Sequence, residues 1–298
     1  YHEGSYANIG TVTPNIIGAA TGNGAITLSN GGTGGTLYGM YIYNYNNPSK
    51  VFVKNNIIGS ITAANTAAAN STNFVGISCQ GFITISNNTI GSTDGATTNS
   101  IYASSPSTGS DQTVFGISIA GSSSYSSTIS GNTISKLSNA TTNPTAGSLG
   151  LINGIMVSDG NNSIINNTIS DLSIANANTA ATYQAAVGGI VINTTSGAAQ
   201  TVKGNTIYNL ANTYSGFAGT VAGICYNGIT GSQISENFIN RLSANATNTA
   251  SIYGIKVLGG TATYSNNIIN VGDNTPATFY GIYENETPKN STNKLYTN

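Results

Sequence analysis

The chain has 298 residues, of which only 6% are charged, and its formal net charge at pH 7 is −1. Ordinary globular proteins carry about 25% charged residues, and a chain with so little charge offers no electrostatic surface for nucleic acid or for an anionic membrane. Two Cys residues exclude a disulfide scaffold and a four-Cys metal site, and no apolar run approaches the ~20 residues that membrane insertion as a helix needs.

In chain order, the first kind of predicted element is a short strand that begins with Gly and an apolar residue. Residues 154–157, Gly-Ile-Met-Val, are typical, because the stretch is short, alternating and bounded by turn residues. The Gly–apolar pair recurs eight times, with 27–40 residues from one Gly to the next. Its positions are Gly39, Gly76, Gly116, Gly154, Gly189, Gly223, Gly254 and Gly281.

The second kind of predicted element contains an Asn with Ile or Leu two residues later, and it alternates with the first. Residues 129–140 (ISGNTISKLSNA) and 164–175 (IINNTISDLSIA) are its most similar copies. An apolar residue stands three positions before most of these Asn residues, from Val12 and Val53 to Tyr264. The Asn positions are Asn15, Asn56, Asn88, Asn132, Asn167, Asn205, Asn237, Asn267 and Asn293.

Together the two elements form a repeated unit that is too small to bury its own apolar face, whereas a stack of such units can do so. Insertions at 91–115 and 138–153 change the length of only one half of the unit. We therefore predict an all-β fold, a right-handed parallel β-helix (solenoid) of about eight coils with variable loops at one corner. Residues 1–298 would form one such domain. Because the chain starts at Tyr1 without Met, we expect it to be a segment of a longer chain.

The Asn column is the most specific signal for this fold, because Asn is a poor strand residue yet stands between apolar residues at fixed offsets. Pointing inward at a coil corner, each amide can hydrogen-bond the Asn of the next coil, as in the Asn ladders of stacked β-structures. We expect Ile134, Ile169 and Ile207 to stack beside the ladder. Its predicted members are Asn56, Asn88, Asn132, Asn167, Asn205, Asn237 and Asn267.

These motifs resemble the parallel β-helix repeat of secreted and cell-surface proteins, with NNTI at 87–90 and 166–169 and GNTI at 131–134 and 204–207 as the closest matches. The resemblance covers nearly the whole chain and implies the fold, which hosts pectate lyases, polygalacturonases, phage tailspikes and adhesins. The loops rich in Ala, Asn and Thr resemble those of large Bacteroidota surface proteins exported by the type IX route. That resemblance implies an extracellular or cell-surface location and secretion or surface-attachment machinery as partners.

Catalytic clusters are missing from the sequence. Nine acidic residues spread over about eight coils give roughly one per coil, whereas glycoside hydrolysis needs two carboxyl groups about 5–9.5 Å apart. Glu284 and Glu286 share the last coil, but no further acidic residues are placed with them. His2 is the only His, and it lies at the start of the chain. We therefore expect no enzyme activity and assign no catalytic, cofactor-binding or metal-binding residue.

Three outward columns offer candidate binding surfaces. The first column lies four positions after the Asn and contains Lys136, Asp171, Asn209 and Arg241. It is interpreted either as a binding ridge or, more simply, as a surface column with an exposed ion pair between Lys136 and Asp171. Tyr253 and Tyr280 precede Gly residues of adjacent coils, so they should stack on each other, and as exposed rings they are possible glycan-stacking residues. A Thr column over four coils is a candidate ice-binding surface, with the members Thr89, Thr133, Thr168 and Thr206.

The first functional hypothesis is a non-catalytic structural or adhesive segment of a secreted or cell-surface protein, acting as a stalk, fibre or adhesin. The alternatives are a carbohydrate-binding or carbohydrate-degrading β-helix and an ice-binding solenoid. The expected partners are glycans or other copies of the chain, with no nucleic acid and no membrane insertion. Cys79 and Cys225 lie four coils apart, roughly 19 Å at ~4.8 Å per coil, so we predict that they are unbonded and point to opposite sides of their sheet.

Overall fold

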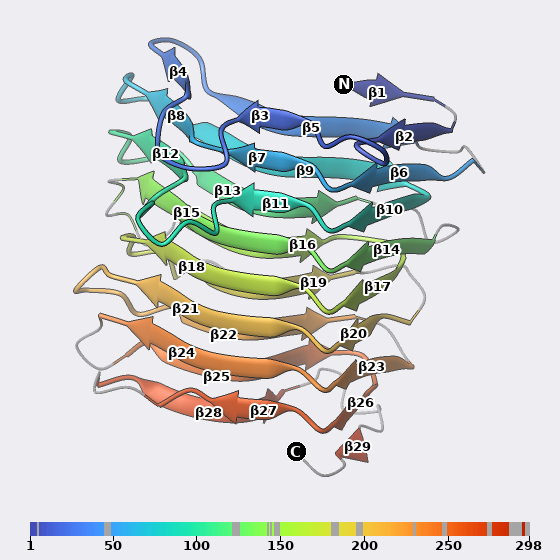
Figure 1. Ribbon diagram of the computed structural model, residues 1–298. Coiled ribbons are helices and arrows are strands. Elements are labelled where there is room, and N and C mark those ends of the chain that lie inside the picture. The colour runs from blue at the N-terminus through green and yellow to red at the C-terminus, as the bar shows by residue number, and fades with distance from the viewer. Residues whose placement is uncertain are drawn as a thin grey trace.

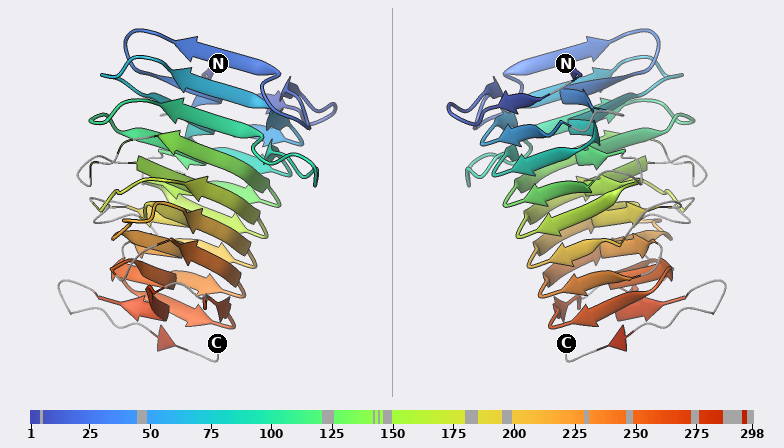
Figure 2. Two further views of the ribbon diagram at one scale, coloured as in Figure 1. Left: turned by 90° about the vertical axis from the view of Figure 1, so that its left-hand side faces the viewer. Right: turned by 90° about the vertical axis from the view of Figure 1, so that its right-hand side faces the viewer.

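The computed structural model is a right-handed parallel β-helix in which three all-parallel sheets, here called A, B and C, run along one axis (Figure 1). The side views show the coils stacked from the N-terminal end to the C-terminal end (Figure 2). The structure describes residues 1–4, 6–44, 49–120, 126–141, 143, 145, 150–179, 185–194, 199–228, 231–245, 249–272, 276–285 and 294–295.

Each coil contributes one strand to sheet A, one to sheet B and one or two to sheet C. Sheet A contains β1 (His2–Glu3), β5 (Gly35–Asn44), β9 (Thr72–Gly81), β13 (Gln112–Ile119), β16 (Gly150–Val157), β19 (Val187–Asn193), β22 (Thr220–Asn227), β25 (Ser251–Gly259) and β28 (Thr278–Glu284). Sheet B contains β2 (Ala7–Ile9), β6 (Val51–Lys54), β10 (Ile83–Ser86), β14 (Ser126–Ser130), β17 (Asn161–Ile165), β20 (Thr201–Lys203), β23 (Ser232–Ser235), β26 (Ala262–Ser265) and β29 (Lys294–Leu295). Sheet C contains β3 (Ile16–Gly18), β4 (Ile26–Asn30), β7 (Ile57–Gly59), β8 (Ile61–Asn65), β11 (Thr89–Gly91), β12 (Ile101–Ser105), β15 (Thr133–Thr141), β18 (Thr168–Ile174), β21 (Thr206–Asn212), β24 (Phe238–Ala244) and β27 (Ile268–Asn270).

The core is built from columns of apolar side chains, and each column contains the equivalent residue of successive coils. Ile134, Ile169 and Ile207 pair in register and are fully buried, as predicted. Because the coil is narrow, β-branched side chains fill it from all three sheets. Among the described residues no helix is long and apolar enough to cross a bilayer.

The Gly column is explained by the same narrow core. A Cβ on Gly154 would lie 2.5 Å from Ile169 Cγ2 and 2.7 Å from the carbonyl oxygen of Gly189 in the next coil. Ile155, the next residue, is also fully buried. Two successive positions of the strand therefore face the core, and only a residue without a side chain fits at the first of them. The equivalent contacts occur from Gly39 to Gly254, whereas a Cβ on Gly281 in the last strand of sheet A meets nothing within 4 Å.

The corner between sheets B and C has a constant length of two residues from the second coil to the eighth. Its first residue has a positive φ of 53–66°. Asn and Gly adopt this left-handed conformation at the lowest energetic cost, which explains why NN and GN precede the Thr-Ile pair so often. The residues with this φ are Asn55, Asn87, Gly131, Asn166, Gly204, Glu236 and Asn266.

Loop length varies at the expected corner, between sheets C and A, where the connection grows from residues 66–71 to residues 175–186. It varies also between sheets A and B and within sheet C, where residues 92–100 separate β11 from β12. The two-residue corner carries the Asn ladder and keeps its length over these seven coils.

Two predicted positions at the ends of the chain are wrong. Val12 is 95% exposed, and Ile9 takes its place in the core column by pairing with Val53. The first B–C corner is longer than the others, so counting back three residues from Asn15 reaches the corner and not the strand. Leu295 pairs with Tyr264, which places it before the ladder position and not after it. Asn293 lies outside the described residues.

Candidate functional site

The predicted Asn ladder is formed, and it runs from Asn15 to Asn267. In each step the backbone N and the side-chain Nδ2 of one Asn donate to the Oδ1 of the Asn in the next coil. The Nδ2–Oδ1 distances are 2.7–3.0 Å and the N–Oδ1 distances are 2.9–3.2 Å. The seven predicted members are at most 2% exposed. Asn15 extends the ladder by one step at the exposed N-terminal end.

A single ladder amide connects three coils. Asn167 Nδ2 donates to the carbonyl oxygen of Ile129 in the preceding coil at 3.0 Å and to Asn205 Oδ1 in the following coil at 3.0 Å. Its Oδ1 accepts from the backbone N and from Nδ2 of Asn132. The side chain thereby supplies partners to corner groups that the sheets leave unpaired.

A second group of buried Asn residues lies where sheet C turns toward sheet A, and sequence reasoning missed it. Asn139 Nδ2 donates to the carbonyl oxygens of Gln112 and Leu151, and Asn212 Nδ2 donates to the carbonyl oxygen of Asn176. The side chains of Asn139, Asn176, Asn178 and Asn212 are at most 1% exposed. The insertions at this corner change the spacing from coil to coil, so these residues show no fixed period in the sequence.

The column four residues after the ladder is a second bend in the backbone. Lys136, Asp171, Asn209 and Arg241 have φ values of 51–63°. Lys136 and Asp171 occupy equivalent positions in adjacent coils, but the predicted ion pair does not form between them. Lys136 Nζ donates to the carbonyl oxygen of Asp94, while Asp171 accepts from Asn209 Nδ2 at 3.0 Å. Asp171 also accepts from the hydroxyls of Ser135 and Ser170. Neutral donors therefore satisfy its carboxylate.

Between described side chains one ion pair forms, and it joins Lys203 to Glu236 at 3.1 Å on the exposed surface. Such a pair contributes at most about 1 kcal/mol to stability.

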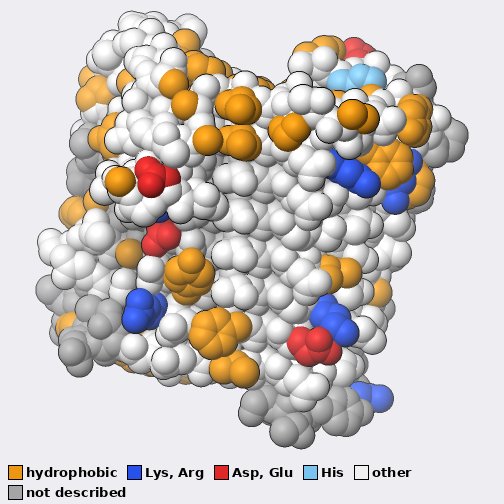
Figure 3. Space-filling view, viewed as in Figure 1, with side chains coloured by type: hydrophobic (Ala, Val, Ile, Leu, Met, Phe, Trp, Pro, Cys, Tyr) orange, Lys and Arg blue, Asp and Glu red, His pale blue; other side chains and the backbone are white. Residues whose placement is uncertain are grey.

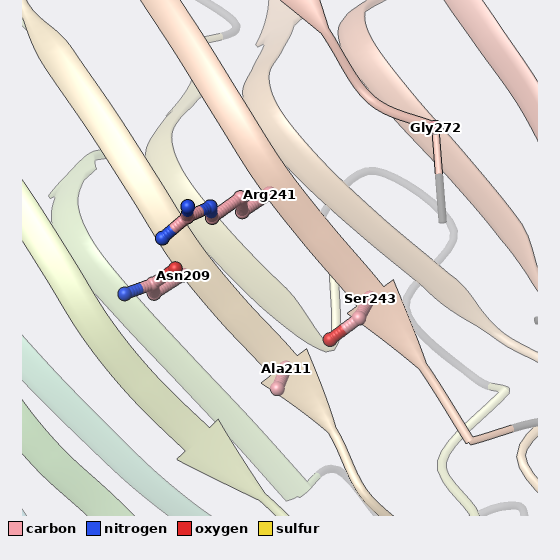
Figure 4. Close-up of a pocket in the computed structure, with 5 residues that line it drawn as sticks. All are labelled: Asn209, Ala211, Arg241, Ser243 and Gly272. Atoms are coloured by element: carbon pink, nitrogen blue, oxygen red, sulfur yellow. The ribbon is translucent and has the colours of Figure 1, made fainter. Parts of the chain in front are cut away.

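A hollow lies beside this bend in the C-terminal half of sheet C. Figure 4 shows Asn209, Ala211, Arg241 and Ser243 with their side chains on the same side of β21 and β24, and Gly272 of the next coil at the edge. Ala211 and Ser243 occupy equivalent positions in the two strands. The hollow combines a guanidinium, an amide and a hydroxyl, which are groups that bind polar ligands.

The predicted Thr column lies on the outer face of sheet C, with its four members in register and partly exposed. Ile16 and Ile57 continue it toward the N-terminal end, and Phe238 and Ile268 toward the C-terminal end. Figure 3 shows this face, with uncharged polar surface between two groups of hydrophobic side chains. Sheet B presents a second outward hydroxyl column, absent from our sequence interpretation, which contains Thr84, Thr128, Ser163 and Thr201.

The rings of Tyr253 and Tyr280 stack on each other, with centroids 4.9 Å apart and an interplanar angle of 9°. Tyr283 packs against both rings, and Lys256 Nζ lies 5.1 Å from the centroid of Tyr253. Tyr253 is only 8% exposed, so Tyr280 and Tyr283 present the accessible part of this cluster. Glycan stacking on Tyr253 and Tyr280 stays a prediction.

Cys79 and Cys225 are unbonded, as predicted, and both are buried. Cys79 lies in the main core in register with Ile119, whereas Cys225 belongs to a separate apolar cluster that also contains Val191 and Tyr253. Burial raises the pKa of the Cys79 thiol, and it raises the pKa of Cys225 to about 11, with nearby Lys256 acting in the opposite direction. Burial also lowers the pKa of Lys256.

Several described carboxylates accept hydrogen bonds from neighbouring groups of the fold. Asp94 accepts from the Thr97 hydroxyl at 2.8 Å and from the backbone N of Ala96, and these hydrogen bonds lower its pKa. No group of three or more His, Cys, Asp or Glu that could hold a metal ion occurs within the described ranges. Glu286, predicted to share the last coil with Glu284, lies outside those ranges, as does Asp273.

No protein-family model matches the chain, and none of the curated proteins compared with it matches either.

Proposed function

We propose that this chain is a non-catalytic structural or adhesive segment of a secreted or cell-surface protein. The proposal rests on one observation, namely that the recurring residues hold the coils together. The Asn ladder, the Gly column and the apolar columns all connect one coil to the next, without a break from Asn15 to Asn267. A solenoid of this kind transmits force along its axis through nearest-neighbour contacts, as a stalk or fibre requires.

The surface composition supports the same proposal. Charged side chains make up 6% of the chain, and hydroxyl and amide groups dominate the outer faces of sheets B and C. Glycan-rich and cell-surface partners are recognised through such polar groups together with aromatic rings. Extracellular or cell-surface exposure, type IX export and attachment to surface machinery belong to this proposal and rest on the resemblance of the repeats and loops.

The test combines location with activity. Intact source cells are treated with an external protease, and the loss of the chain is followed with an antibody. Purified protein is incubated with pectin, alginate and host-type glycans, and its thermal melt is measured with and without EDTA. We expect cleavage on intact cells, no released reducing ends or unsaturated sugars, and coincident melts. Turnover that disappears in Asp171→Asn or Glu284→Gln would replace this proposal with a carbohydrate-degrading enzyme.

A second candidate function is ice binding, and the two outward hydroxyl columns favour it. Neighbouring Thr residues of one column lie about 4.8 Å apart, the spacing of paired strands, so the face presents hydroxyl and methyl groups at a regular interval. Thermal hysteresis and inhibition of ice recrystallisation test this function. Activity that Thr133→Tyr abolishes and Ser78→Tyr, on the outer face of sheet A, leaves unchanged would favour ice binding over the structural role.

A further inference from the structure

Arg241 is the single Arg of the chain and is exposed. It forms no ion pair and no hydrogen bond with any other residue in the part of the chain that the structure describes. Among the described residues, no aromatic ring and no carboxylate pairs with this guanidinium, so its five N–H donors are not engaged within that part of the chain.

The backbone at Arg241 is in the left-handed region, with a φ of 51°. A long side chain pays a steric penalty there that Gly and Asn largely avoid. Asn209, one coil earlier, is a residue that tolerates this conformation. The same conformation recurs at Lys136 and Asp171, so the bend belongs to the fold, and in this coil it carries the Arg side chain that lines the hollow (Figure 4).

None of the described carboxylates neutralises this guanidinium. Asp171 lies two coils away, and its carboxylate accepts from Ser135, Ser170 and Asn209. Asn209 Nδ2 is engaged by Asp171, and Figure 4 shows its Oδ1 on the side nearer Arg241. From the described residues, the hollow therefore offers a guanidinium without an ion pair, an amide oxygen that accepts and the Ser243 hydroxyl.

Among the described residues of the next coil, no strand covers the hollow. Strand β27 pairs with β24 only over Phe238–Asn240, and residues 273–275 of that coil lie outside the described ranges. Gly272, at the edge, has no side chain to fill the space.

Two rings stand beside the hollow on the outer face of sheet C. Tyr208 directly precedes Asn209, and Phe238 lies three residues before Arg241 with 38% of its surface exposed. Their neighbours Ile207 and Ile239 point into the core, so both rings point outward. Phe238 occupies the position that Thr fills in the four preceding coils. Aromatic faces of this kind pack against the apolar face of a sugar ring.

We propose that this hollow binds an acidic sugar, that is, a glycan residue that carries a carboxylate. Arg241 pairs with the carboxylate through two parallel N–H···O bonds, the geometry that the planar guanidinium favours. Asn209 Oδ1 and the Ser243 hydroxyl bind the sugar hydroxyls, and Phe238 packs on the ring. The inference rests on the proposed adhesive function and names the ligand class of that function.

The test is isothermal titration calorimetry of the full chain with tetragalacturonate, its methyl ester and sodium sulfate. The key variant is Arg241→Asn, which removes the cation and places a tolerated residue in the left-handed bend. The matched control is Lys136→Asn, which makes the same change of charge and residue type at the equivalent bend position of another coil, away from the hollow. Thermal melts of both variants establish that they fold.

We expect tetragalacturonate to bind wild type and Lys136→Asn equally and Arg241→Asn about 10- to 100-fold more weakly, the effect of losing a charge-assisted pair. The methyl ester should bind wild type as weakly as Arg241→Asn binds the acid, and Phe238→Thr should weaken binding several-fold. Equal affinities of wild type and Arg241→Asn, or competition by sulfate at the same concentration as the sugar, would overturn the inference. Release of unsaturated or reducing sugars during the titration would instead contradict the non-catalytic function.

Discussion

Replacing Asn167 by Ala removes one step of the ladder, and the structure gives the size of the effect. Asn167 is 1% exposed, so water does not replace its amide. The backbone N of Asn132 loses its acceptor, which lies at 3.0 Å, and remains buried. Four further hydrogen bonds are lost, with Asn132 Nδ2, Asn205 Oδ1 and the carbonyl oxygens of Ile129 and Ile165.

An orphaned buried donor costs about 1–3 kcal/mol, and each remaining bond contributes about 0.5–1.5 kcal/mol, so we expect Asn167→Ala to lower the free energy of unfolding by about 3–9 kcal/mol. Asn240→Ala is the matched control, because Asn240 is a partly exposed Asn on the outer face of β24. It should change the free energy of unfolding by less than about 0.5 kcal/mol.

Urea unfolding followed by circular dichroism measures both changes. Hydrogen exchange followed by mass spectrometry locates them, since in a solenoid the loss acts first on the two adjacent coils. We expect faster exchange at the amide of Asn132 and in β14 and β17, and unchanged exchange in β25. If Asn167→Ala were as stable as Asn240→Ala, the ladder would not hold the coils together, and the reasoning about the corner would be wrong.

The Gly column and the two thiols give the remaining predictions. Gly154→Ala places a Cβ 2.5 Å from Ile169 and should destabilise the fold by about 1–3 kcal/mol through overpacking. Gly95→Ala, where an added Cβ meets nothing within 4 Å, is its control in thermal melts, and equal melting temperatures of the two variants would contradict the packing argument. At pH 8 neither Cys should react with a disulfide reagent in the native state, because both are buried and the pKa of Cys225 is raised to about 11. Both should react after unfolding in urea. Rapid labelling of Cys225 in native protein would instead show that the apolar cluster around it opens and exposes the thiol.

Several features of the fold follow from the sequence because they repeat. A coil exposes its apolar face until the next coil covers it, so each column must recur at every coil, and a recurring column is visible in a single sequence. The ladder, the Ile column at 134, 169 and 207 and the opposite orientations of the two Cys residues were predictable in this way. Counting residues from the Asn positions misplaced Val12, because the first corner is longer than the others. It also misplaced Leu295, which lies in a strand of sheet B, before the ladder position and not after it.

The tertiary structure decided what depends on the path of the chain between the columns. Lys136 Nζ donates to the carbonyl oxygen of Asp94, and Asp171 accepts from Asn209, so no ion pair joins these two neighbours of the column, although the repeat alone places them side by side. The buried Asn group around Asn176 follows loops of unequal length and has no period. The hollow at Arg241 lies beside the part of β24 that does not pair with β27. The sequence by itself determined the contacts that every coil shares, since stacking imposes them on all coils alike, and the structure determined where one coil differs from its neighbours.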